Sequence, residues 1–163
     1  MIGARLPLAL ETGRLSLPTG RIAVFHPTPE ANLRSLPVEQ CEIIQPFRPA
    51  YETFKSAGYS CAVEPTERYA LSIVCLPRAK AEARSIIAKA AAFTDGPIII
   101  DGQKTEGVDS IFKDLRKRGD VSVTISKAHG KLFWVNSHDG LEDWGQTPTL
   151  TEGGFWTGPG VFS

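Results

Sequence analysis

The chain has no glycine at the point where a nucleotide-binding α/β protein most needs one. Residues 21–33, RIAVFHPTPEANL, are typical of a short buried strand that runs into a loop. Glycines at such a junction let the backbone turn tightly and approach a cofactor closely. Here Pro27 and Pro29 remove two amide donors, and we expect no residue to supply the positive φ of that turn. The junction therefore predicts that this chain has no cofactor cradle.

A second requirement of a nucleotide site is also missing. The carboxylate that holds a ribose in such folds follows the second strand. The segment 42–47, EIIQPF, ends instead in Gln45 and Pro46, and Glu42 lies at the opposite end of that strand. We therefore expect no cofactor-binding residue in this chain.

Charge, cysteine and long apolar runs are equally sparse. Lys plus Arg and Asp plus Glu number 18 each, so no global charge attracts nucleic acid or an anionic membrane. The three cysteines lack the spacing of a metal site or a disulfide framework. No apolar run approaches the ~20 residues of a membrane-spanning helix, and the N-terminus is a poor signal peptide. We expect a cytoplasmic protein with reduced thiols, no metal and no membrane partner.

Catalytic groups are not evident either. Cys61 and Cys75 lie in apolar runs, where cysteine usually behaves as a small buried hydrophobe. A thiol nucleophile needs an activating partner within hydrogen-bond reach. The acidic residues between positions 95 and 109 fall on different predicted elements, without the matched environments of an acid–base pair. We expect no catalytic residue.

What the chain does contain is an alternation of strands and helices. The first twenty residues are interpreted as an irregular arm. Apolar runs predict strands, and apolar stripes at helical spacing predict helices. The strands are expected over 22–25, 42–47, 61–65, 69–77 and 96–102, and the helices over 47–58, 79–93 and 107–119. Within the last helix, Asp109 and Lys113 are expected to pair. The segments 121–126 and 132–136 are typical of an antiparallel hairpin.

This order predicts an α/β fold, a mainly parallel Rossmann-like sheet flanked by helices and ending in an antiparallel hairpin. After Val135 the regular pattern stops, and the remaining residues are rich in Gly, Thr and Pro. Residues 1–137 are therefore predicted to form the domain with its N-terminal arm, and residues 138–163 a linker or tail.

A basic cluster is the one candidate binding site. Lys104, Lys127, His129 and Lys131 are expected to meet near the sheet edge, where they could contact the phosphates of RNA. A solvated hairpin turn, with Gly130 supplying its geometry, is the simpler interpretation of the same residues. A second basic group at the end of the 107–118 helix is explained by the helix dipole.

Several segments together resemble a known family. DGQKTEGVDSI (101–111), ISKAHGKLFWV (125–135), QPFRPAYETFKSAGY (45–59) and GPGVFS (158–163) are similar to the N-terminal half of bacterial small-subunit rRNA (guanine-N2) methyltransferases of the RsmC-like type. Such proteins resemble two methyltransferase domains in tandem. The second carries the S-adenosylmethionine site and the chemistry, and the first is a degenerate duplicate. The family's Asn-Pro-Pro-type motif has no counterpart here, since the matching strand ends in Cys75-Leu76-Pro77-Arg78.

The resemblance implies a degenerate class I methyltransferase-type domain without its own cofactor. The methyl donor would belong to a catalytic domain that residues 138–163 lead toward, either in the same protein or lost. The partners would be that domain and the rRNA of the small ribosomal subunit, and the process rRNA methylation. Two other interpretations stay open. One is an active single-domain S-adenosylmethionine-dependent methyltransferase with an atypical loop, and the other is a pure interaction or dimerisation module.

Overall fold

The computed structural model describes residues 2–136 apart from positions 12, 14, 30, 32, 34, 119, 120, 123 and 128, and describes the backbone alone at 2–4 and 118. The predicted tail, residues 138–163, lies outside the described residues. So does Gly119, the last residue of the helix expected over 107–119.

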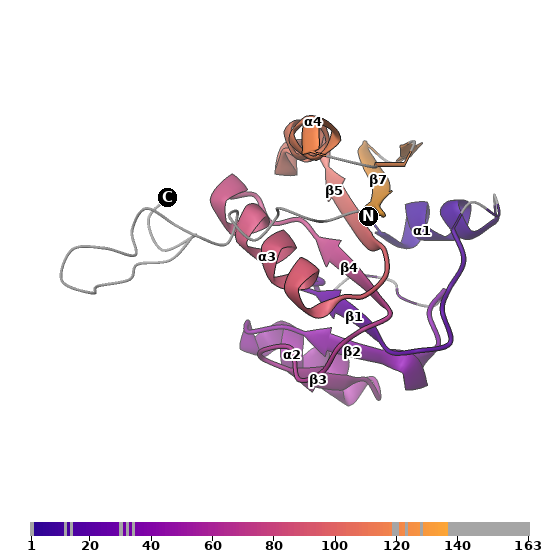
Figure 1. Cartoon of the computed structure of the whole chain (residues 1–163). Helices are drawn as coiled ribbons and strands as arrows, with labels where there is room; N and C mark the ends of the chain where they lie inside the picture. The colour runs from indigo at the N-terminus through magenta and orange to yellow at the C-terminus, as the bar shows by residue number, and fades with distance from the viewer. Residues whose placement is uncertain are drawn as a thin grey trace.

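A seven-stranded sheet in the order β3-β2-β1-β4-β5-β7-β6 forms the centre of the molecule (Figure 1). Five strands run parallel, and β7 pairs antiparallel with both β5 and β6. The strands are β1 (Ile22–Phe25), β2 (Cys41–Ile44), β3 (Ser60–Ala62), β4 (Leu71–Cys75), β5 (Ile98–Gln103), β6 (Ile125–Lys127) and β7 (Gly130–Val135). The predicted mainly parallel sheet with a terminal antiparallel hairpin is confirmed.

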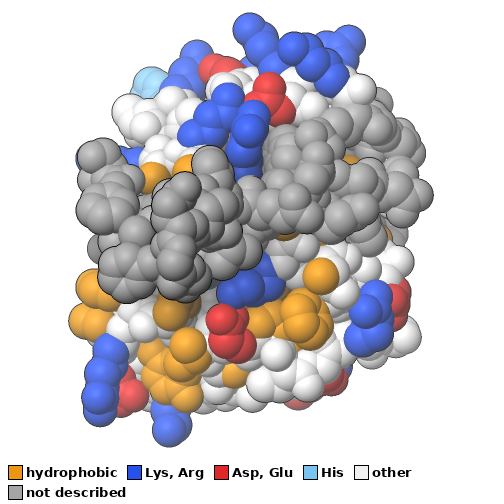
Figure 2. Space-filling view, turned by 60° about the vertical axis from the view of Figure 1, so that its left-hand side comes forward, with side chains coloured by type: hydrophobic (Ala, Val, Ile, Leu, Met, Phe, Trp, Pro, Cys, Tyr) orange, Lys and Arg blue, Asp and Glu red, His pale blue; other side chains and the backbone are white. Residues whose placement is uncertain are grey.

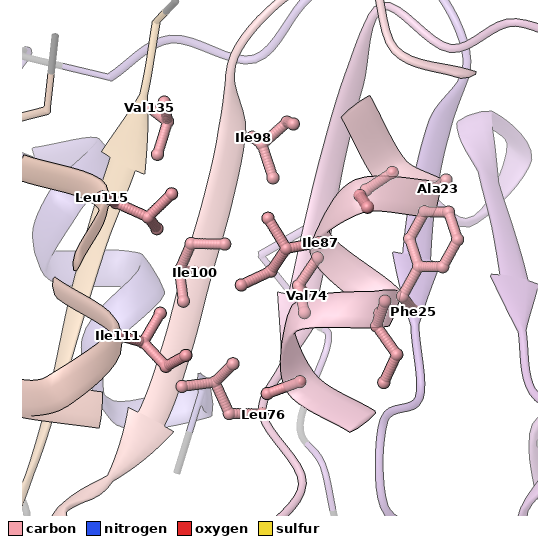
Figure 3. Packing of buried hydrophobic residues seen from close by; sticks show 14 of the residues in the cluster. Ala23, Phe25, Val74, Leu76, Ile87, Ile98, Ile100, Ile111, Leu115 and Val135 are labelled. Atoms are coloured by element: carbon pink, nitrogen blue, oxygen red, sulfur yellow. The ribbon is translucent and has the colours of Figure 1, made fainter. Parts of the chain in front are cut away.

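Helices cover both faces of this sheet. They are α1 (Ile2–Glu11), α2 (Arg48–Ser56), α3 (Lys80–Phe93) and α4 (Val108–Arg118), with 3-10 turns η1 (Val38–Gln40) and η2 (Lys104–Glu106). In Figure 3, Ile87 of α3 and Ile111 and Leu115 of α4 point toward Val74 and Ile100 of the sheet. The opposite face carries a second apolar cluster that includes residues of α1 and α2.

Strand alternation explains why two cores form. Successive side chains of a strand point to opposite faces, so a strand covered on both sides must be apolar throughout. All four residues of β1 are buried: Ala23 and Phe25 join the α3/α4 core, while Ile22 and Val24 join the α1/α2 core. Each fully buried Ile or Phe contributes roughly 1.5–3 kcal/mol.

The N-terminal helix α1 corrects the predicted irregular arm. Pro7 lies inside this helix and removes one backbone donor, which is why propensity argued against it. Burial outweighs that cost, because Leu6 and Ala9 are fully buried in the α1/α2 core. Where the helix propensity of a segment is low, tertiary packing determines whether it forms a helix.

Two connections contain less helix than a regular βαβ sheet provides. Among the described residues, the β1–β2 connection has only the short turn η1, and the β3–β4 connection has no helix. Prolines at 27, 29, 37 and 65 interrupt these segments. The β3–β4 connection is instead fastened to the sheet, because Tyr69 Oη and Thr66 Oγ1 both donate to Oε1 of Glu42.

Boundary differences elsewhere are small. The segment expected as a strand over 69–77 forms β4 at Leu71–Cys75, while Tyr69 makes an isolated bridge with Thr94. Val121 likewise makes only an isolated bridge with Val135, so the predicted strand 121–126 is reduced to β6. No helix in the described part of the chain is long and apolar enough to cross a membrane.

Candidate functional site

The carboxyl ends of the five parallel strands meet at one side of the sheet, which we call the carboxyl edge. In open α/β sheets ligands bind outside this edge, where the strand order reverses. Here the reversal lies between β1 and β4, which are neighbours in the sheet although β2 and β3 separate them in sequence. The junctions after β1 and β2 are therefore where a nucleotide cofactor would be held.

His26 makes the turn that follows β1. Its φ is 58°, in the left-handed region, and its backbone N–H donates to the carbonyl of Ile44 over 2.9 Å. The expectation that no residue here would adopt positive φ is therefore wrong. Histidine is among the non-glycine residues that tolerate this region. Pro27 and Pro29 follow, and neither has an N–H to offer a phosphate.

Gln45 follows the end of β2, and both polar atoms of its carboxamide make a hydrogen bond within the protein. Nε2 donates to the carbonyl of Pro27 over 2.8 Å, and Oε1 accepts from the backbone N–H of Phe47 over 2.9 Å. The side chain is buried, with 5% of the residue exposed. It ties the loop after β1 to the end of β2 and offers no carboxylate oxygen to a ribose.

Glu42 does not replace that carboxylate. It lies near the start of β2, is buried, and accepts from Thr66 Oγ1 over 2.8 Å and from Tyr69. Burial, then the hydrogen bond with Glu42, raises the pKa of Tyr69 to about 12. Tyr69 therefore stays a hydrogen-bond donor at any physiological pH, and Glu42 serves the β3–β4 connection.

The described residues line two hollows at the carboxyl edge. One of about 140 Å³ lies between the ends of β1 and β2 and helix α3, over Phe25, Ile44 and Ile86. The other, about 290 Å³, lies beside α2 and is lined by Gln45, Pro46, Arg48, Tyr51, Glu52 and Val63. Pockets for cofactors and drug-sized ligands usually measure roughly 300–1,000 Å³. The hollow next to the β1 junction is thus less than half the lower limit.

The described residues around the β1–β2 junctions therefore lack the usual features of a methyl-donor site. Two prolines replace amide donors, Nε2 and Oε1 of Gln45 each make a hydrogen bond within the protein, and the hollow that the described residues form there measures about 140 Å³. The described residues also contain no group of three His, Cys, Asp or Glu side chains that could hold a metal ion.

The smaller hollow is polar at its rim. Lys89 Nζ lies 2.6 Å from Oε2 of Glu64, and both residues line the hollow together with His26. Burial, and then the charge of Lys89, lowers the pKa of His26 from 6.5 to about 4, while Glu64 acts in the opposite direction. The imidazole is consequently neutral at physiological pH.

The cysteines are poor nucleophiles. Burial raises the pKa of Cys41 to about 11 and also raises the pKa of Cys61 and Cys75. A thiol reacts as its thiolate, so these groups are inert near neutral pH.

The four candidate RNA-binding residues come together at one end of the carboxyl edge. Lys127 ends β6, His129 turns toward β7 with a φ of 60°, and the N–H of Lys104 donates to the carbonyl of His129 over 3.0 Å. Lys104, Lys127 and His129 are exposed. RNA contact by this cluster stays a prediction.

Lys131 differs from the other three. Its Nζ lies 2.6 Å from Oδ1 of Asp109 and 6.0 Å from the centre of the Phe112 ring. The hydrogen bond from Lys131 is the main reason that the pKa of Asp109 is lowered. The pairing expected between Asp109 and Lys113 is thus replaced by one with Lys131, whose charge is largely offset.

Arg5 of α1 organises the same end of the sheet and was missed by sequence reasoning. It is fully buried, with Nε 2.6 Å from Oδ1 and Nη2 3.0 Å from Oδ2 of Asp101. Its Nη1 donates to the carbonyl of Lys127 over 2.7 Å and to Oε1 of Gln103 over 3.2 Å. The available signal was a single cation within the apolar run IGARLPLAL.

Solved structures with a similar fold include methyltransferases bound to the methyl donor. The 16S rRNA N2 methyltransferase RsmC of T. thermophilus, in complex with AdoMet and guanosine, is similar with a TM-score of 0.60 and 22% identity. That match covers 80% of this chain and 38% of RsmC, so this chain spans well under half of that protein. Magnesium protoporphyrin IX methyltransferase of Synechocystis, with bound SAM, gives 0.55 and 14%, covering 81% of this chain and 76% of that chain.

A protein of Thermoplasma acidophilum gives a TM-score of 0.61 and 18% identity, covering 83% of this chain and 84% of that one. The sequence matches no protein-family model and no curated protein. The chain thus has the Rossmann-like fold of class I methyltransferases, as predicted.

Proposed function

We propose that this chain is a methyltransferase-type domain that has lost its methyl-donor site and serves as the non-catalytic half of a cytoplasmic rRNA methyltransferase. The observation that carries the proposal is the engagement of Gln45 with Pro27 and Phe47. These hydrogen bonds join the ends of β1 and β2 at the position where a methyl donor would need free hydrogen-bond acceptors. The match to 38% of RsmC supports a role as one part of a larger enzyme.

In this role the domain supports a catalytic domain and helps hold rRNA of the small subunit. Lys104, Lys127 and His129 supply exposed cations and a hydrogen-bonding imidazole at one end of the carboxyl edge. Phosphate contacts of this kind need no global positive charge, only a local one. Lys131 contributes less, because Asp109 offsets its charge.

The competing function is an active methyltransferase with an unusual loop. Two observations favour it: His26 makes a left-handed turn after β1, and solved neighbours of the same fold hold SAM or AdoMet. Both functions predict the same sheet, so only donor binding separates them.

Isothermal titration calorimetry of the full chain with S-adenosylmethionine and S-adenosylhomocysteine tests the proposal. A donor-binding methyltransferase titrated in parallel is the positive control. We expect no heat of binding at millimolar donor. Micromolar binding to this chain would overturn the proposal and establish the active-enzyme alternative.

The RNA role is tested by measuring the affinity of the chain for a small-subunit rRNA fragment at several salt concentrations. The variant Lys104→Glu with Lys127→Glu should weaken binding and reduce the slope of log affinity against log salt by about 2. Arg116→Glu with Lys117→Glu, on exposed positions of α4, is the charge-matched control. Equal affinities for the two variants would contradict a role for the hairpin.

A further inference from the structure

Phe47 is exposed in a way that the fold does not explain. It follows β2 at the carboxyl edge, and 61% of it is accessible, against 41% for Val38 and 56% for Val63. Its backbone is held, since its N–H donates to Oε1 of Gln45 and its carbonyl accepts from the N–H of Tyr51. A large aromatic ring is therefore presented to solvent from a fixed position.

The adjoining 290 Å³ hollow combines three kinds of chemistry. Tyr51 supplies a second ring, fixed by the hydrogen bond from its hydroxyl to the carbonyl of Cys61 over 3.3 Å. Arg48 supplies an exposed guanidinium and Glu52 a carboxylate. Unstacked bases of single-stranded nucleic acid bind on aromatic rings and guanidinium planes, and carboxylates accept hydrogen bonds from exocyclic amino groups.

Exposed cations continue from this hollow along the carboxyl edge. Arg48 follows β2, Arg78 follows β4, Lys104 follows β5 and Lys127 ends β6. None of the four has an ion pair within the described part of the chain. From β2 to β6 there are five strand spacings, or roughly 24 Å, which a few nucleotides can span. Figure 2 shows hydrophobic side chains gathered in the lower part of the face it brings forward, with lysine and arginine side chains in both the upper and the lower part.

We propose that the carboxyl edge binds single-stranded RNA. One unstacked base lies in the hollow against Tyr51, and a neighbouring base stacks on the exposed ring of Phe47, which lies in the chain between the lining residues Pro46 and Arg48. The following phosphates lie along Arg78, Lys104 and Lys127. The inference rests on the RNA role in the proposed function and extends it beyond the hairpin. Glu52 makes the hollow select a base that carries an amino group, so cytosine is favoured over uracil.

RNA is favoured over a protein partner because the cations lie beyond the apolar residues. A protein docked on Phe47 and Val63 alone would have no use for Arg78 and Lys104. Carboxylates nearby are partly engaged, with Glu64 paired to Lys89 and Glu106 accepting from the N–H of Gln103 over 2.8 Å.

The experiment is fluorescence anisotropy of the full chain with labelled oligo(C) and oligo(U) of about eight nucleotides, within the usual site size of single-strand binders. We expect tighter binding of oligo(C). Phe47→Ala should weaken oligo(C) binding roughly tenfold or more, the scale of one lost stacking contact. Val38→Ala removes an exposed apolar side chain before β2, at the opposite edge, and should change nothing.

Two further variants separate binding from folding. Glu52→Ala should abolish the preference for oligo(C) and increase affinity for oligo(U), because a carboxylate near phosphates is removed. Arg78→Glu should lower the salt slope by about 1. All these positions are exposed, so thermal unfolding should stay unchanged and serve as the control for folding.

The outcomes distinguish this inference from the proposed function. Weaker binding by Lys104→Glu with Lys127→Glu, together with unchanged binding by Phe47→Ala and Arg78→Glu, would overturn the extended site and leave the hairpin role standing. In that case Phe47 and Val63 would be a protein contact. If the parent chain bound no RNA, both the extended site and the RNA role of the hairpin would be overturned.

Discussion

The buried pair of Arg5 and Asp101 should be the largest single polar contribution to stability. Arg5 is 0% exposed and Asp101 5% exposed, and two short hydrogen bonds join them. Replacing Arg5 by alanine leaves a carboxylate buried without its counter-charge. Breaking a buried pair in this way costs about 3–5 kcal/mol, a large share of the 5–15 kcal/mol that typically stabilises a domain.

Urea denaturation followed by circular dichroism measures this loss of unfolding free energy, and thermal denaturation measures the fall in melting temperature. For a domain of this size, Arg5→Ala should lower the melting temperature by roughly 6–20 °C. Arg21→Ala is the matched control, since Arg21 pairs with Glu67 at 3.2 Å but the side chains are 31% and 42% exposed. An exposed pair contributes less than about 1 kcal/mol.

A double variant tests the cause. Arg5→Met combined with Asp101→Leu removes both charges and keeps the apolar volume, so it should be more stable than Arg5→Ala. If Arg5→Ala costs no more than Arg21→Ala, or if the double variant is no better than the single one, the argument from uncompensated burial is refuted.

Two other predictions concern Gly130 and His26. Gly130→Ala should destabilise the domain by about 1–3 kcal/mol in urea denaturation. The added Cβ would lie 2.5 Å from Gln103 Oε1 and from the carbonyl of Gly102, and closer still to Arg5 Nη1. A variant as stable as the parent would contradict this tight fit. The second prediction concerns pH. His26 has a pKa of about 4 when folded against 6.5 when unfolded, so the unfolded state binds more protons between these values. The free energy of unfolding should therefore fall by up to roughly 3 kcal/mol as pH drops through that window. His26→Asn, which tolerates left-handed φ, should flatten this dependence, and a dependence unchanged by it would assign the effect to other groups.

Elements with a strong local pattern could be predicted from the sequence alone. The apolar stripe at Ala83, Ile86, Ile87, Ala90 and Ala91 indicated α3. The first four residues are buried, and Ala91 is partly buried against the same core. The unbroken apolar run at 98–100 indicated a central strand, and β5 lies between β4 and β7. Such patterns are local, because burial repeats with the period of the element itself.

Elements and partners that depend on distant residues were missed. Helix α1 contains Pro7, and its stability comes from docking against β6 and β7, more than a hundred residues away. Lys131 and Asp109 pair across β7 and α4, whereas a helix-only argument favoured Lys113. Neither outcome follows from periodicity, since both require knowing which elements are neighbours.

The chemical groups that follow β1 and β2 were determined by the sequence alone. A proline has no N–H in any fold, and Gln45 carries no carboxylate wherever it lies. What those groups do instead was decided by the tertiary structure: Gln45 bonds to Pro27, and His26 turns left-handed where glycine would be expected. The sequence determines which chemical groups each residue carries. Tertiary packing determines which groups meet, because it brings Arg5 and Asp101, 96 positions apart, into contact.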